Sequence, residues 1–158
     1  MILKTGYNRV ETWLTSVGGF LQSLVLLALR LYWGWQFFLT GKGKLLHLER
    51  TAGYFASLDI PLPKLNAMLA GTTECVGGLL LLIGLGSRLV SVPLLFVLAI
   101  AYATAERDAA RAIFSDPDKF TAATPFLFLV AVVVVFAFGP GRLSLDAWLK
   151  RPGAPKKP

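Results

Sequence analysis

Two charged side chains interrupt apolar stretches that are long enough to cross a membrane. Arg30 lies between the apolar run 19–29 and an aromatic run, and Glu74 divides the apolar stretch 65–85. A charge at the bilayer centre costs about 2.5–3.5 kcal/mol on insertion scales, and ionisable residues at that depth are functional-site candidates. If the two stretches are consecutive antiparallel helices, their midpoints meet, so we predict an Arg30–Glu74 ion pair inside a helix bundle. The pair could equally be a structural clamp that fixes helix register.

Further side chains in these and a third apolar stretch could complete a ligand site around the pair. A site for an apolar ligand needs an apolar slot with a few hydrogen-bond donors, and a carboxylate at membrane depth could relay protons. The candidate substrate-binding residues are Arg30, Trp33, Gln36, Glu74 and Tyr102. Trp33 has a second interpretation, as a residue of the aromatic belt at the membrane interface. No residue is assigned a catalytic role.

Other reactive side chains are scarce. The single cysteine, Cys75, excludes an internal disulfide and a CxxC motif. The single histidine, His47, excludes a bis-histidine haem or a multi-histidine metal centre built from this chain alone. We therefore expect no metal site and find no cofactor-binding motif.

Composition indicates a membrane protein of one domain. Apolar residues make up 55% of the 158 residues and charged residues 16%, whereas soluble domains average roughly 45–50% and 25%. The formal net charge of +7 could suggest a nucleic-acid partner. The lysines and arginines, however, flank the apolar stretches instead of covering a soluble face. The expected partner is therefore the lipid bilayer, and no nucleic acid is expected.

The apolar stretches predict four membrane-spanning helices, over residues 18–40, 64–85, 88–105 and 121–138. Residues 84–87 read Gly-Leu-Gly-Ser, which is typical of a tight turn. The second and third spans should therefore run antiparallel to each other.

Residues 45–58 predict a short amphipathic helix between the first two spans. The stretch is too short and too charged to span a bilayer, so it should lie at the interface or fold back over the mouth of the bundle. We predict an all-α integral membrane four-helix bundle with this interfacial helix between spans 1 and 2. The chain then divides into a polar N-terminal segment (1–17), the membrane domain (18–141) and a basic, Pro-rich C-terminal tail (142–158).

Small residues recur at four-residue spacing in the second span. Such rows let helix backbones approach closely, which drives packing inside lipid. Glu74 belongs to one of them, so its side chain should face protein, and the same rows could support a homo-oligomer. The rows are Ala67, Gly71 and Cys75, and Ala70, Glu74 and Gly78.

Four spans place both termini on one side of the membrane. Lysines and arginines are almost evenly divided between the two sides, so the positive-inside rule does not decide the orientation. We place the termini in the cytoplasm.

An ordered set of motifs resembles the DoxX family. Residues 29–38, followed by Gly41 and Lys44, resemble its first-helix signature, and residues 74–88 are similar to its second-helix motif. Ala101-Tyr102 and residues 114–120 match later motifs. Arg30 and Glu74 coincide with recurrent polar positions of the family. The resemblance covers about residues 24–145, nearly the whole chain apart from its ends.

The resemblance implies a small, multi-pass protein of the bacterial inner membrane. Family members are grouped with the small membrane subunit of thiosulfate:quinone oxidoreductase, and others are linked to oxidative-stress or metal-stress systems. The chain is then expected to be a membrane component of a quinone-linked redox or stress-response system that works with a soluble redox partner. Whether it is an enzyme subunit stays open. The alternative is a non-catalytic scaffold or small-solute carrier whose buried charges only organise the bundle.

Overall fold

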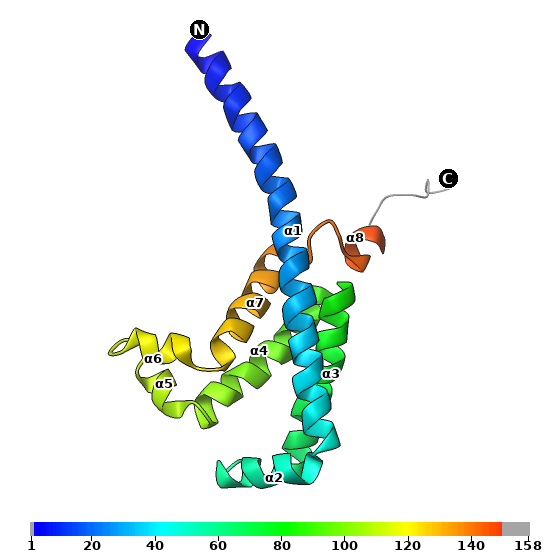
Figure 1. The fold of residues 1–158 in the computed structure, drawn as a ribbon, viewed down its shortest axis with the longest axis vertical. Helices are drawn as coiled ribbons and strands as arrows, with labels where there is room; N and C mark the ends of the chain where they lie inside the picture. The colour runs from blue at the N-terminus through cyan, green and yellow to red at the C-terminus, as the bar shows by residue number, and fades with distance from the viewer. Residues whose placement is uncertain (1, 150–158) are drawn as a thin grey trace, which may run out of the picture.

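The computed structural model describes residues 2–149, with side chains from Glu11 onward. Within this part the chain forms α-helices and no β-strand, which confirms the all-α prediction (Figure 1). The helices are α1 (Ile2–Leu46), α2 (Leu48–Ser57), α3 (Pro63–Ile83), α4 (Ser87–Thr104), α5 (Arg107–Arg111), α6 (Pro117–Ala122), α7 (Pro125–Phe138) and α8 (Leu145–Leu149).

Three helices are long and apolar enough to cross a membrane: α1 from Glu11 onward, α3 and α4. The 21 residues of α3 rise about 31 Å, close to the ~30 Å hydrocarbon thickness of a bilayer. The apolar helix α7 has only 14 residues, or about 21 Å. The predicted fourth span is shorter than 121–138 because Pro125 has no N–H with which to continue a helix from the preceding turn, and α6 ends at Ala122.

Helix α1 is longer at both ends than the predicted span 18–40. Its N-terminal half is helical from Ile2 and stands clear of the other helices (Figure 1). At the other end, the segment Gly41-Lys42-Gly43-Lys44 stays helical, although glycine is a poor helix former. Gly41 is buried there against α3, so packing between the helices compensates for the poor propensity.

Glycines set the antiparallel contact between α1 and α3. Gly34 faces Gly78, and Gly41 faces Gly71 seven residues further along α1. A Cβ at Gly78 would lie 2.5 Å from the backbone nitrogen of Phe38, and a Cβ at Gly41 would lie 2.6 Å from the carbonyl oxygen of Gly71. The two backbones are therefore in direct contact, as the small-residue rows of the second span predicted.

The predicted tight turn joins α3 to α4. Gly84 (φ +71°) and Gly86 (φ +58°) adopt left-handed conformations that other residues rarely reach. From this turn α4 diverges from α3 and packs against α7 (Figure 1). One apolar core joins α1, α3, α4 and α7. Its buried members are Phe37, Leu81, Leu94, Leu98, Val132 and Val135.

The remaining segments lie at the two ends of this core. Helix α2 crosses the Pro63 end of α3 with Ala52 buried, and it begins later than predicted because residues 45 and 46 belong to α1 (Figure 1). Helices α5 and α6 connect α4 to α7. In the predicted tail, residues 142–149 contact the turn between α3 and α4 and include α8. The basic residues Lys150, Arg151, Lys156 and Lys157 lie outside the described residues.

Candidate functional site

A buried ion pair joins the end of α1 to the middle of α3. The Lys44 ammonium donates hydrogen bonds to both carboxylate oxygens of Glu74, at 2.5 Å to Oε1. The Glu74 side chain is 7% exposed and the Lys44 side chain 29%. A carboxylate is thus paired and covered inside a helix that is long and apolar enough to span a membrane, while its basic partner keeps some exposure.

The helix geometry explains how Lys44 reaches Glu74. Side chains tilt toward the N-terminus of their own helix, so Lys44 points back along α1 from its last turn toward the middle of α3. The start of α2 fixes the backbone here, because Thr51 Oγ1 donates to the carbonyl oxygen of His47 at 3.1 Å and lies 3.4 Å from that of Lys44. The α1–α2 corner therefore positions the ammonium.

The predicted Arg30–Glu74 ion pair is wrong. Arg30 lies beside Gly84, where a Cβ would collide with its Nη1. Gly84 is ten residues beyond Glu74, or about 15 Å along the axis of α3. The prediction aligned the midpoints of two apolar stretches. The glycine contacts, together with the extension of α1 to Leu46, instead set a register that brings Lys44 to Glu74.

Arg30 forms a second charge centre with the C-terminal segment. Its side chain is buried, at 1% exposure, and Nη2 donates to the carbonyl oxygen of Leu143. Asp146 lies close enough for its charge to act on Arg30. The Asp146 carboxylate accepts hydrogen bonds from the backbone N–H groups of Gly86 at 2.8 Å and Ser87 at 3.1 Å. The atoms Nε and Nη1 of Arg30 have no hydrogen-bond partner within the described part of the chain.

The other three predicted site residues lie in separate surroundings. The Trp33 ring meets Phe128 of α7 edge-on at 4.7 Å, and Gln36 is half-buried on α1. Tyr102 is buried; its hydroxyl donates to the carbonyl oxygen of Phe120 at 3.1 Å, and the two rings stack at 4.7 Å. The fold therefore does not gather the five predicted residues around one Arg30–Glu74 pair.

Sequence reasoning missed Lys44, because the predicted first span ended at residue 40. The seven-residue spacing of Gly34 and Gly41 matches that of Gly71 and Gly78. Aligning those two glycine pairs would have placed Lys44 within reach of Glu74. Within residues 11–149, no group of three or more His, Cys, Asp or Glu side chains could hold a metal ion.

Comparison with protein-family models gives a match to DoxX over residues 25–107. The matched region includes α3 and α4, and it contains Arg30, Lys44 and Glu74. This confirms the family resemblance of the motifs. No curated protein and no solved structure gives a significant match to the chain.

Proposed function

Because the chain belongs to the DoxX family, we propose that this small membrane protein is a component of a quinone-linked redox or stress-response system in the bacterial inner membrane. The buried Lys44–Glu74 pair is the observation that carries the proposal. Ionisable residues inside spanning helices are costly and usually functional. This pair lies near the middle of α3, whose length matches a bilayer.

The chemistry of the pair suits a quinone headgroup. The partly exposed Lys44 ammonium can donate to a quinone carbonyl oxygen, and the covered Glu74 carboxylate can exchange a proton with the reduced form. The electrons would come from a soluble redox partner. The chain would then serve as the quinone-binding subunit of an oxidoreductase.

Trp33, Gln36 and Tyr102 lie in other surroundings than the Lys44–Glu74 pair, so their part in quinone binding stays a prediction from the sequence. Trp33, with Phe128, offers an aromatic wall, and Gln36 offers a half-buried amide. Tyr102 could contribute its hydroxyl by releasing the carbonyl oxygen of Phe120. Arg30 is about 15 Å away along the helix axis and is left out.

The proposed setting is a four-span bundle with α7 as the short fourth span. The helix α2 would lie at the interface on the side opposite the cytoplasmic termini. The glycine rows of α3 are used inside the chain by α1, so a homo-oligomer would need another surface.

Quinone binding by the purified protein in nanodiscs tests the proposal. We expect the wild type to retain quinone through purification and to bind added quinone. The double variant Lys44→Gln/Glu74→Gln should bind it at least about tenfold more weakly while keeping its helix content. The matched control is Glu49→Gln/Lys64→Gln, because those residues form an ion pair that is 80% and 65% exposed.

Two results would contradict the proposal. One is a folded wild type that neither retains nor binds quinone. The other is equal quinone affinity in the wild type and the folded double variant. Either result would favour the scaffold alternative, in which the pair only holds α1 against α3.

A further inference from the structure

A pocket of about 400 Å³ opens between the start of α4 and the end of α7. Its volume lies within the ~300–1,000 Å³ typical of small-molecule sites. One cationic and one anionic side chain lie beside apolar ones in its wall. The residues that matter here are Arg88, Leu89, Phe138, Pro140 and Asp146.

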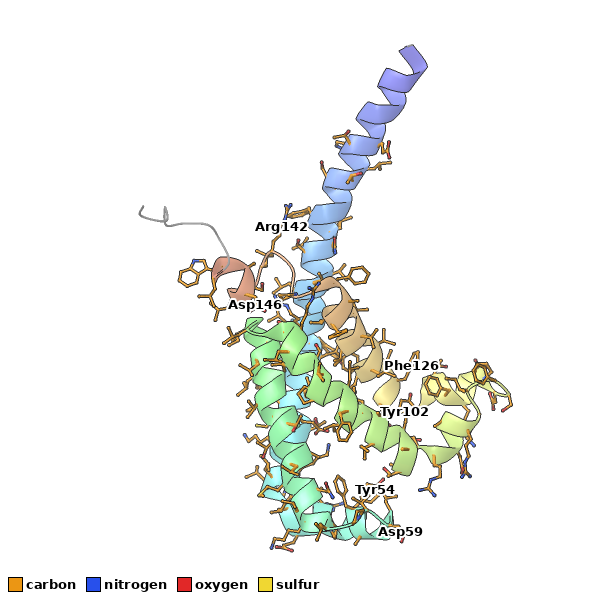
Figure 2. The ribbon with its side chains drawn as sticks, turned by 180° about the vertical axis from the view of Figure 1, so that it is seen from behind. Tyr54, Asp59, Tyr102, Phe126, Arg142 and Asp146 are labelled. Carbon is orange, nitrogen blue, oxygen red and sulfur yellow. The ribbon has the colours of Figure 1, made fainter. Side chains whose placement is uncertain are left out.

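If α3 and α4 span the bilayer, the pocket lies at the depth of the lipid headgroups. The apolar helices α3 and α7 end here and α4 begins, and Figure 2 shows Asp146 at this end of the bundle. Leu89 is 78% exposed and Phe138 62% exposed. Where spanning helices end, exposed apolar side chains reach acyl chains and charged side chains reach lipid headgroups.

Arg88 and Asp146, the two charged residues of the pocket, can each form further hydrogen bonds. Arg88 Nη2 donates to the carbonyl oxygen of Ala137 at 3.1 Å, which uses one of the five donors of a guanidinium. Each Asp146 carboxylate oxygen accepts one backbone N–H, from Gly86 or Ser87, and each can accept another hydrogen bond. The pocket therefore offers a cationic donor and an anionic acceptor together.

The acceptor is held in place by the C-terminal segment. The backbone N–H of Asp146 donates to the carbonyl oxygen of Gly84 at 2.9 Å, and Arg30 Nη2 binds the carbonyl oxygen of Leu143 three residues earlier. These bonds fix Asp146 at the mouth of the pocket before any ligand arrives, which lowers the ordering cost of binding.

We propose that this pocket binds the headgroup of phosphatidylethanolamine. The phosphate pairs with the Arg88 guanidinium, which matches phosphate oxygens in a forked geometry. The primary ammonium donates to the Asp146 carboxylate, and the acyl chains follow Leu89 and Phe138. The Asp146 carboxylate selects this lipid by hydrogen bonding, because neither a glycerol nor a choline headgroup has an ammonium N–H to donate to it.

Native mass spectrometry of the delipidated full chain, titrated with each lipid in detergent, tests this proposal. We expect phosphatidylethanolamine to bind at least about tenfold more tightly than phosphatidylcholine or phosphatidylglycerol. Arg88→Gln should weaken the binding of all three lipids, because they share the phosphate, and Asp146→Asn should remove the preference for phosphatidylethanolamine. Arg142→Gln is the control, since Arg142 is an exposed arginine near the same end but outside the pocket.

The exposed position of Arg88 keeps the test decisive if Asp146→Asn fails to fold. A folded Arg88→Gln variant that binds phosphatidylethanolamine as tightly as the wild type would overturn the proposal. So would equal affinity of the wild type for all three lipids, or a preference for phosphatidylglycerol.

Discussion

Lys44 and Glu74 depend on each other at the level of single residues. Removing one partner of a buried pair leaves an uncompensated charge, whereas removing both can be nearly neutral. The interaction is therefore measured by comparing single and double substitutions, because either single change mixes the loss of a contact with the burial of a charge.

We predict that Lys44→Met alone destabilises the protein by about 3 kcal/mol, since it strands the Glu74 carboxylate at 7% exposure. The double variant Lys44→Met/Glu74→Leu should recover much of that loss. Denaturant unfolding in detergent micelles, followed by circular dichroism, measures the free energy of unfolding of the single and the double variant. The pairing would be refuted if the double variant were as unstable as the sum of the two single variants.

At the scale of helices, the contact between α1 and α3 depends on glycines at particular positions. Gly41 and Gly43 lie two residues apart on α1, but only Gly41 touches α3. A methyl group at Gly41 would overlap the backbone of Cys75, whereas nothing lies within 4 Å of a Cβ at Gly43. The same chemical change therefore has opposite consequences at the two sites.

We predict that Gly41→Ala destabilises the bundle by about 1–3 kcal/mol, because the helices must move apart. Gly43→Ala should be neutral or stabilising by up to about 1 kcal/mol, because alanine favours the helix. Thermal unfolding of the two variants beside the wild type measures the difference. Similar melting temperatures for both variants would mean that Gly41 does not lie in a close helix contact.

The elements that the sequence predicted well are those with local signals. The apolar runs of α3 and α4, and the turn at Gly84 and Gly86, follow from hydropathy and glycine spacing. The register of α1 against α3 does not follow from such local signals, because it depends on contacts between residues far apart in sequence. Arg30 was therefore assigned the wrong partner, and its actual partner, the carbonyl oxygen of Leu143, is a backbone atom 113 positions away that no side-chain pattern marks.

At the scale of the whole molecule, the described contacts group the segments at the two ends of the bundle. The start of α4 and the C-terminal segment meet through Asp146. If α4 spans the bilayer, its far end carries α5 and α6 to the opposite side, together with α2.

We predict that cysteines introduced at Leu89 and Trp148 react with an impermeant thiol reagent from one side of the membrane, and those at Phe114 and Tyr54 from the other. All four positions are well exposed, with Phe114 at 94%. A Cys75→Ser background removes the only native thiol. Labelling of Leu89→Cys and Phe114→Cys from the same side would exclude α4 as a membrane span.

Arg30 and Lys44 belong to one uninterrupted helix, 14 residues or about 21 Å apart. One holds the C-terminal segment at the α3–α4 turn, and the other holds Glu74 near the middle of α3. Any sliding or rotation of α1 against α3 must therefore disturb both interactions in a single motion. We therefore expect the two regions to respond together: a displacement of α1 that opens the Lys44–Glu74 pair would also loosen the C-terminal segment.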